Sequence, residues 1–327
     1  MIKNIDKRLN SIDTFEKKEN IKIPDTKKKF LQLIITEMNN KLNLLNLFPN
    51  EEKLEIILEQ VNDLKKSLDS FRPLEGVHID KLNDYFDEVY TYDSTTIEGN
   101  TLTLQETALV LNKGVTIGGK SLREHFEIIN HKEALDHIKE IVKNNEPFNK
   151  MILLDIHHLI LKNIDVNSAG KYRNIDVMIS GSQHKPPTYL QVQNLMDEYF
   201  NFYEENKDKL NPVILATEMH ERLVTIHPFT DGNGRTSRLI MNLILLQHGF
   251  PVTNISSQNN SREDYYNCLE TAQTKDDKSL FHKFIANNVK EALIKYLEII
   301  SVNGDETTKG EYFYTKCLEY SNNKDKK

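Results

Sequence analysis

Apolar residues recur every three or four positions along most of the chain, the spacing that places them on one face of an α-helix. The pattern predicts helices over Leu122–Val142 and Met151–Leu161, and a nearly all-apolar helix over Arg235–His248. Two earlier segments show the same spacing: Phe30, Leu31, Leu33, Ile34 and Met38, then Leu54, Ile57, Leu58, Val61, Leu64 and Leu68. A helix that is apolar on all sides is expected to be buried, so residues 235–248 should lie inside the domain.

Local signals predict where some of these helices begin and end. Thr103 is followed three residues later by Glu106, which is the capping-box pattern, and Gly114 is expected to end that helix. Asn211 followed by Pro212 is typical of a helix start, because proline is favoured at the first helical position.

One segment favours β structure instead. Val177, Met178 and Ile179 are apolar and precede Ser180-Gly181, so we expect a short hairpin that closes before Pro186-Pro187. The predicted fold class is therefore mainly α, a helical bundle with one small β-hairpin.

The chain is expected to divide into three parts. Residues 1–80 are charge-rich and helical, with Pro73 and Gly76 near their end, and are interpreted as an accessory extension. Packing of this extension into the main core remains an alternative. Residues 81–300 are expected to form the main domain, and residues 301–327 a C-terminal tail with a disordered end.

The composition is that of a globular protein with an acidic surplus. Of the 327 residues, 38% are hydrophobic and 28% are charged, and the formal net charge is −7 at pH 7. This balance argues against a nucleic-acid-binding protein, which usually has a basic surplus. The two cysteines, Cys268 and Cys317, lie far apart and fit a reducing compartment. No signal-peptide core or membrane-length apolar segment is present, so we expect a cytoplasmic protein without a membrane partner.

The segment IHPFTDGNGRTSRLIM, Ile226–Met241, places unusual chemistry between two predicted helices. Gly232 and Gly234 allow a tight turn that leads into a helix N-terminus, where unpaired amides and the helix dipole attract anions. Arg235 and Arg238 share one helix face, and each guanidinium can contact two phosphate oxygens at once. Together these groups predict a polyphosphate-binding loop.

Three further side chains of this segment complete the predicted chemistry. Asp231 would repel phosphate unless a cation lay between them, and Mg²⁺ bound by carboxylate and phosphates resolves that repulsion. Asn233 can donate an amide hydrogen bond to a phosphate oxygen. His227 is placed to accept a proton from an incoming hydroxyl. The segment therefore predicts transfer of a nucleotidyl or phosphoryl group to a hydroxyl.

Two other motifs fail on spacing. A P-loop would need Gly-Lys-Ser/Thr at the helix start, where this chain has Gly234-Arg235-Thr236. A zincin would need a second histidine four residues after His220, and that position is Val224.

The segment resembles the signature of the Fic (fido) family of protein AMP-transferases, His-x-Phe-x-Asp/Glu-Gly-Asn-Gly-Arg-x-x-Arg. Every fixed position is filled, by His227, Phe229, Asp231, Gly232, Asn233, Gly234, Arg235 and Arg238. The resemblance covers residues 93–289, with a catalytic core over 148–290. Within it, Gly170-Lys171-Tyr172-Arg173 is similar to the family's lead into its target-binding flap.

The resemblance implies a role for each matched residue. His227 would be the base that deprotonates the target hydroxyl, which attacks the α-phosphate of ATP and releases pyrophosphate. Phe229 would pack inward and anchor the loop, and Asp231 would hold Mg²⁺. The intact Gly-Asn-Gly stretch favours AMP transfer over the family's phosphorylating branch.

The remaining signature residues would bind the phosphates. Gly232, Asn233 and Gly234 would cradle them, and Arg235 and Arg238 would hold the β- and γ-phosphates.

Two further segments would bind the target and the base. The flap, Val177 to Ile179, would hold the target segment by strand addition. Tyr265, Tyr266 and Ala272 lie in a segment similar to the family's helix that flanks the adenine, and Gln273 would contact the adenine ring.

An upstream segment, Asp93-Ser94-Thr95-Thr96-Ile97-Glu98-Gly99-Asn100, carries a second motif. Asp93 or Ser94 is expected to cap a short helix over residues 93–100, and Gly99 to end it. Glu98 would then lie at the helix C-terminus, where the dipole disfavours a carboxylate, so it needs a partner and an arginine would serve.

This segment resembles the family's inhibitory motif, Ser/Thr-x-x-x-Glu-Gly/Asn, which Ser94, Glu98 and Gly99 fill. Its position matches the class with an N-terminal inhibitory helix. The resemblance implies that Glu98 pairs with Arg238, which can then no longer hold the γ-phosphate.

The leading interpretation is thus an autoinhibited, Mg²⁺-dependent protein adenylyltransferase. Its partners would be ATP and a protein with a Ser, Thr or Tyr hydroxyl, and a homodimer remains open. Removal of AMP, or transfer of another nucleotide, by the same site is an alternative. A non-catalytic nucleotide-sensing or partner-binding module, whose Glu98 never leaves Arg238, is an alternative from another class.

Some of these residues also have a structural interpretation. Tyr265 and Tyr266 fit equally well as core aromatic residues, and His220 is interpreted as a core histidine. His157 and His184 have no companion at ligand spacing and are assigned to the surface or to the scaffold.

Overall fold

The structure is a computed structural model that describes residues 53–75, 77–301 and 310–313. It divides into two compact units, one formed by residues 1–74 and 293–327 and the other by residues 75–292. The apolar pattern at residues 30–38 and the end of the C-terminal tail lie outside the described residues. Among the described residues, no helix is both long and apolar enough to cross a membrane.

The first unit contains α3, Leu54–Asp69, and the last part of α12, Ser279–Ile300. The apolar stripe of α3 is buried as its spacing predicts, at Ile57, Val61 and Leu68. The edge of Phe71 packs on Phe313, with ring centroids 5.3 Å apart.

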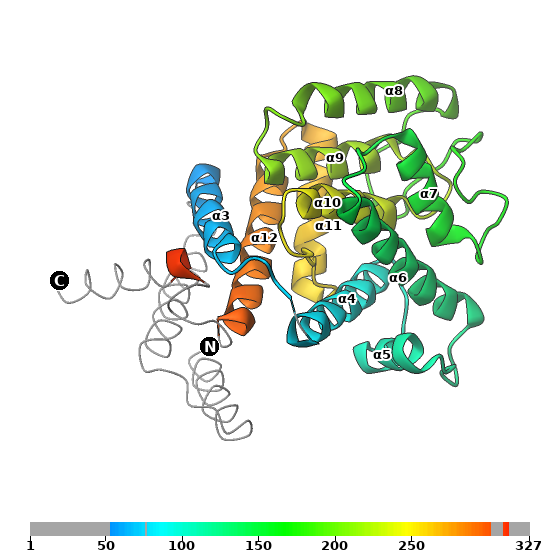
Figure 1. The fold of residues 1–327 in the computed structure, drawn as a ribbon. Helices are drawn as coiled ribbons and strands as arrows, with labels where there is room; N and C mark the ends of the chain where they lie inside the picture. Colours follow the sequence, from blue (N-terminus) through cyan, green and yellow to red (C-terminus); the bar gives the residue numbers. More distant parts are fainter. Residues whose placement is uncertain (1–52, 76, 302–309, 314–327) are drawn as a thin grey trace. The chain divides into compact units, whose positions relative to one another are not determined.

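The second unit is helical throughout its regular structure (Figure 1). Its helices are α4 (Val77–Ile97), α5 (Leu104–Lys113), α6 (Leu122–Lys143), α7 (Lys150–Leu161), α8 (Tyr189–Asn206), α9 (Pro212–Ile226), α10 (Asn233–Gln247), α11 (Asn259–Lys275) and the first part of α12. The nearly all-apolar α10 contacts α4, α6, α7 and α9, and its residues from Arg235 to Leu245 are buried. The prediction that this helix lies inside the domain is confirmed.

Helix starts predicted from local sequence are also confirmed. The Thr103 hydroxyl accepts from the Glu106 amide, the Glu106 carboxylate accepts from the Thr103 amide, and Gly114 ends α5 in the left-handed conformation. The Asn211 side chain caps α9 and Pro212 follows as its first residue.

The described residues contain no β-strand, so the mainly α class is confirmed while the hairpin is not observed. Residues 177–179 have no regular structure, and a turn at Ser180-Gly181 follows them. A two-stranded hairpin is marginal by itself, and Pro186 and Pro187 have no N–H to donate to a ladder.

The short helix expected over residues 93–100 is also not formed. Asp93 and Ser94 lie inside α4, a single helix of 21 residues that ends at Ile97. Asp93 does not cap a helix, because its carboxylate accepts hydrogen bonds from the Asn254 side chain and from the backbone and hydroxyl of Ser257. Gly99 does follow the helix end, with φ 105°.

Candidate active site

The loop between α9 and α10 begins at His227, which ends α9 in the left-handed conformation (φ 52°, ψ 56°). Non-glycine residues adopt this conformation uncommonly, and histidine is among those that do so more often than most. The His227 amide donates to Leu223 O at 2.9 Å. Gly232, with φ 77°, then turns the chain into α10.

The ring of His227 is held in one tautomer. Its Nδ1 lies 3.2 Å from Val224 O, and a carbonyl only accepts, so Nδ1 carries the proton and Nε2 keeps a free lone pair. Burial lowers the pKa of His227, the positive charge of Arg173 lowers it further, and Glu98 opposes the shift. The imidazole is therefore neutral near pH 7 and able to accept a proton at Nε2.

Phe229 is fully buried and holds the loop against α7. Its ring stacks on His157, with centroids 3.6 Å apart and planes 7° apart. The Asn233 side chain closes the loop from within, because its Oδ1 accepts from Phe229 N and its Nδ2 donates to Phe229 O. The sequence suggested that this side chain donates to a phosphate, but the structure uses it to fix the loop.

His157 has a role in the site that its sequence spacing did not indicate. It is fully buried on α7. Its Nδ1 accepts from Gly170 N at 2.9 Å, so its Nε2 carries the proton and donates to Asp231 O at 3.0 Å. Burial lowers the pKa of His157 to about 4. The neutral imidazole of His157 thus fixes the backbone of Asp231 through a hydrogen bond.

Asp231 presents its carboxylate at the mouth of the loop, with 43% of its side chain exposed. Oδ1 accepts from Gly232 N at 2.6 Å and from Arg235 Nη2 at 3.1 Å. Oδ2 accepts from Arg123 Nη2 at 2.9 Å, a residue of α6 that the sequence did not indicate. Among the described residues, no group of three or more His, Cys, Asp or Glu side chains could hold a metal ion. Metal binding here would therefore depend on Asp231 together with oxygens of a bound ligand.

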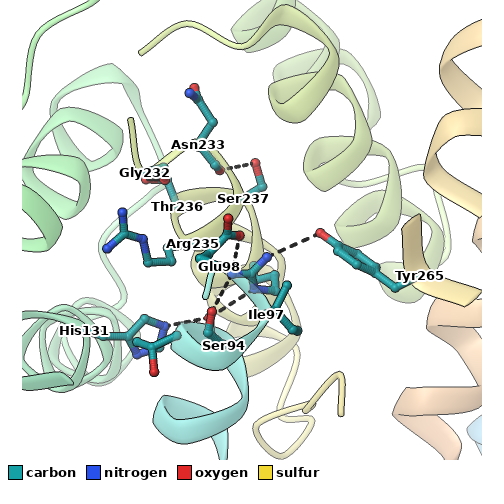
Figure 2. A network of polar contacts seen from close by, with 12 residues as sticks. Ser94, Ile97, Glu98, His131, Gly232, Asn233, Arg235, Thr236, Ser237 and Tyr265 are labelled. Carbon is teal, nitrogen blue, oxygen red and sulfur yellow. Dashed lines mark hydrogen bonds and ion pairs between the residues drawn. The ribbon is translucent and has the colours of Figure 1, made fainter. Parts of the chain in front are cut away.

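Arg238 is buried beside the end of α4. Figure 2 shows its neighbours Ser94, Glu98 and Tyr265. Its Nε donates to Ser94 Oγ at 3.0 Å, and its Nη2 donates to Ser94 O at 2.7 Å and to Glu98 Oε1 at 2.8 Å. Burial would lower the pKa of Arg238, but the nearby Glu98 carboxylate reverses the effect and raises it. The structure thus brings together Ser94, Glu98 and Arg238, as the motif predicted.

His131 of α6 joins this polar cluster through Ser94 (Figure 2). Its Nε2 lies 2.9 Å from Ser94 Oγ. Because Arg238 Nε already donates to this oxygen, the Ser94 hydroxyl is free to donate to a neutral His131. Burial, then the charges of Arg238 and Arg235, hold the pKa of His131 well below its usual value.

Glu98 lies directly over the first turn of α10. A Cβ added at Gly234 would come within 2.2 Å of Glu98 Oε1. This approach places the carboxylate at a helix N-terminus, where unpaired amides and the dipole favour an anion. Glu98 therefore occupies space that only a glycine at position 234 leaves open.

The predicted adenine-binding residues of α11 differ in exposure. Tyr265 is buried, and its hydroxyl lies 3.0 Å from His220 Nε2 and 3.5 Å from Arg238 Nη1. Tyr266 is 39% exposed, and its hydroxyl donates to Ile97 O at the end of α4. Gln273 Nε2 is buried and lacks a hydrogen-bond partner within the described part of the chain.

The segment between Arg173 and α8 passes beside His227. Arg173 Nε donates to His227 O at 2.8 Å, and His184 Nε2 donates to Thr225 O at 2.9 Å. The predicted flap residues lie on this segment, and the side chain of Met178 is 95% exposed. His184, like His157, thus has a role that its sequence spacing did not indicate.

Residues 147–245, which include the whole loop, match the Fic/DOC family. A protein adenylyltransferase Fic from Nematostella vectensis is 37% identical over 216 residues, which are 65% of this chain and 49% of that protein. The chain contains a Fic/DOC domain over residues 147–245. Its resemblance to the Fic signature is thereby confirmed. The protein adenylyltransferase fic-1 of Caenorhabditis briggsae is 31% identical over 257 residues, 78% of this chain and 50% of that protein. The chain spans about half the length of these curated relatives.

Solved structures of Fic proteins have the same fold. A fragment of Fic-1 from Caenorhabditis elegans superposes with a TM-score of 0.69 at 25% identity, covering 90% of this chain and 88% of that one. A Fic-domain-containing signaling protein from Bacteroides thetaiotaomicron superposes with a TM-score of 0.68 at 28% identity, covering 75% of this chain and 97% of that one.

Proposed function

We propose that the chain is a protein adenylyltransferase, which moves AMP from ATP to a hydroxyl of a protein side chain. The observation that carries the proposal is the arrangement of the α9–α10 loop. A neutral imidazole with a free Nε2, that of His227, stands at one end, and two buried guanidinium groups, those of Arg235 and Arg238, stand at the other. The relatives that match this chain over most of its length are named protein adenylyltransferases.

The chemical step needs one base and a pyrophosphate leaving group. His227 Nε2 accepts the proton of the target hydroxyl while the hydroxyl oxygen attacks the α-phosphorus of ATP. A new oxygen–phosphorus bond forms. The bond from the α-phosphorus to the bridging oxygen breaks, and its electron pair leaves with pyrophosphate. The lowered pKa of His227 keeps the base unprotonated at neutral pH.

The start of α10 would bind the triphosphate. The backbone amides of Asn233 and Gly234 belong to the first turn, where N–H groups have no intrahelical acceptor. Arg235 would hold the β-phosphate and Arg238 the γ-phosphate, each by paired N–H···O bonds. We assign Asn233 to this site through its backbone, because its side chain is engaged with Phe229.

Asp231 would hold Mg²⁺. Its carboxylate is a hard oxygen ligand, partly exposed beside the phosphate-binding turn, and one carboxylate with substrate phosphates is a common environment of this ion. When bound, Mg²⁺ would neutralise phosphate charge and hold the triphosphate in line for attack.

The end of α4 would act as an internal inhibitor. In the structure Arg238 donates to Ser94 and to Glu98, so its guanidinium is not available to a γ-phosphate. Hydrogen bonds to charged groups contribute about 1.5–3 kcal/mol each. Shifting a population from almost fully closed to almost fully open takes about 5.5 kcal/mol. The Glu98 contact alone is smaller than this, so a low residual activity is expected in the wild type.

The exposed flap would hold the target. Val177, Met178 and Ile179 lie on an irregular segment beside His227, and a target segment could pair with this backbone by strand addition. The acceptor would then be a Ser, Thr or Tyr hydroxyl that this pairing brings to Nε2.

The experiment is intact-protein mass spectrometry after incubation with ATP and Mg²⁺. Wild type, Glu98→Gly and Glu98→Gly/His227→Ala are compared under the same conditions. A gain of one AMP moiety that is largest in Glu98→Gly and absent from the double variant supports the base, the inhibitor and the reaction together. Failure of Glu98→Gly to bind ATP in a calorimetric titration would reject the proposal.

A further inference from the structure

Residues 174–188, here called the flap segment, connect Arg173 to the start of α8 and are tied to the scaffold at several points. The Tyr189 amide donates to Asp176 Oδ1 at 2.8 Å, across the two ends of the segment. His184 donates to Thr225 O in the last turn of α9, and the Gln183 amide donates to Glu270 Oε1 at 2.6 Å. The flap segment is therefore held on the same element that ends in His227.

Arg173 contacts both ends of the flap segment and the loop of His227. Its Nε donates to His227 O at 2.8 Å, and its backbone amide donates to Pro228 O at 2.9 Å. Its Nη1 donates to Ile175 O at 2.9 Å, and its Nη2 donates to Pro187 O. One planar guanidinium thus joins the beginning of the flap segment, its end and the carbonyl of His227.

The environment of this guanidinium is unusual. The Arg173 side chain is fully buried, yet its hydrogen bonds go to three backbone carbonyls rather than to a carboxylate. The nearest carboxylate oxygen, from Asp176, is 3.8 Å away and 65% of that side chain is exposed. Burying a charge in this way costs free energy. A neutral side chain that donated hydrogen bonds to the same carbonyls would have a lower desolvation cost.

We infer that Arg173 is a positioning residue that sets the ring of His227 relative to a target segment on the flap, an inference that rests on the proposed function. The base and the target hydroxyl must meet within hydrogen-bond distance, and a shift of about 1 Å is able to cost a hundredfold in rate. His227 ends α9 in the left-handed conformation, and Arg173 holds its carbonyl. The flap segment and His227 are therefore connected through the side chain of Arg173.

Charge adds a second effect to this geometry. Burial has the largest effect on the pKa of His227 and lowers it; the hydrogen bond to Val224 O and the charge of Glu98 raise it, while Arg173 and His184 lower it. Replacing Arg173 by a neutral residue should therefore make the imidazole easier to protonate as well as less well placed. Replacing it by lysine retains the charge, but a single ammonium cannot reproduce the planar fork that reaches three carbonyls.

The first test measures the ring of His227 without using activity. Two-dimensional NMR of histidine-labelled protein gives the tautomer and pKa of each imidazole, and His227→Ala assigns the signal. Arg173→Gln should raise the pKa of His227 and weaken its Nδ1-protonated tautomer, while Arg173→Lys should leave the pKa close to that of wild type. Lys171→Gln, an exposed site two residues away, is the matched control and should change neither. An unchanged His227 signal in Arg173→Gln would overturn the inference.

The second test measures self-modification in the Glu98→Gly background, with ATP and Mg²⁺ as the only additions. Arg173→Gln should reduce kcat by about tenfold to a hundredfold while the KM for ATP changes less than about twofold. The acid limb of its rate profile should move to higher pH, which a general loss of folding would not cause. Arg173→Lys should reduce kcat without moving that limb.

Two outcomes separate this inference from the proposed function. Parallel loss of kcat and of ATP binding in both Arg173 variants would make Arg173 a general structural residue and would overturn the inference. Failure of Glu98→Gly to bind ATP would reject the proposed function, and the NMR titration would still decide whether Arg173 positions His227. Circular dichroism of each variant identifies any that fail to fold, in which case Arg173→Lys, the milder change, decides.

Discussion

Glu98 and Arg238 lie 140 positions apart in the chain, and their side chains meet at 2.8 Å between Oε1 and Nη2. The arginine is almost fully buried, while 35% of the glutamate side chain is exposed. An ion pair with one buried partner is screened less than a surface pair, and removing the glutamate leaves the buried charge with fewer partners. The contact is therefore one in which the partly exposed Glu98 side chain can move away while the buried Arg238 side chain keeps its position; we call this contact the latch.

Ser94→Ala should weaken this latch. It removes the hydroxyl that accepts from Arg238 Nε and contacts His131, at a cost of about 1–2 kcal/mol. A loss of that size changes a population about five- to thirtyfold, so self-modification should rise, but less than in Glu98→Gly. Thr95→Ala is the control, because the Thr95 hydroxyl donates only to carbonyls of its own helix. Equal rates in Ser94→Ala and Thr95→Ala, measured by mass spectrometry, would contradict the prediction.

Gly234→Ala should conflict directly with Glu98. The new Cβ would lie 2.2 Å from Glu98 Oε1, so the carboxylate must move. Moving the carboxylate breaks its hydrogen bond with Arg238, at a cost of about 1–3 kcal/mol. In Glu98→Gly the obstacle is absent and the same substitution should cost clearly less. The four proteins of this double-mutant cycle are compared by urea unfolding, and additive free energies of unfolding would exclude the predicted contact.

The sequence allowed the core of the site to be predicted, because the signature residues are contiguous. The α9–α10 loop and the cap at Asn211 follow from patterns within short segments. The proximity of Glu98 to Arg238 was implied only by the resemblance of two separate segments to Fic motifs. The role of His157 could not be found in this way, and Arg173 was indicated only as part of the lead into the flap, without its contact to His227. Each acts through backbone atoms more than 50 positions away, Asp231 O and His227 O respectively, and nothing next to them in the chain marks that contact.

The error at α4 has a similar physical origin. Asp93 and Ser94 are typical helix caps, and in isolation they compete with the helix for backbone partners. In the folded chain their side chains instead pair with Ser257 and Arg238, far along the sequence. Those tertiary partners remove the reason for the helix to begin there, so α4 continues through both residues.

Buried histidines should make the fold sensitive to acid. Burial lowers the pKa of His157 to about 4 and that of His220 to about 3, against about 6.5 when unfolded. Between the two values the unfolded chain binds a proton that the folded chain excludes, so stability is complete above pH 6.5 and falls as the pH drops towards 4. His157 alone should account for about 3 kcal/mol over that window. Urea unfolding between pH 7 and pH 4.5 measures the slope, which should be shallower in His157→Gln; an equal slope would contradict the assignment.

Gly170→Ala should be more damaging than its conformation alone explains. Gly170 has φ 70°, and a Cβ there would lie 3.1 Å from Leu154 O and from His158 Cβ, in the segment that holds His157. Gly119 has a similar φ of 78° with nothing within 4 Å, so Gly119→Ala measures the conformational cost alone. We expect Gly170→Ala to exceed this control by about 1–3 kcal/mol. Thermal unfolding gives both values, and equal losses would mean that the backbone at Gly170 shifts freely.

Arg123→Gln should make Mg²⁺ bind more readily. Arg123 Nη2 donates to the Asp231 oxygen that points away from Arg235, and a metal ion would have to compete with this cation. Both side chains are partly exposed, at 59% and 43%, so the pair is weak and readily displaced. In the Glu98→Gly background, the Mg²⁺ concentration that half-saturates self-modification should fall about two- to fivefold, with the maximal rate unchanged. Lys171→Gln removes one positive charge elsewhere on the surface and controls for the change in net charge. A fall of the same size in both variants would show that Arg123 acts only through overall charge and does not compete for Asp231.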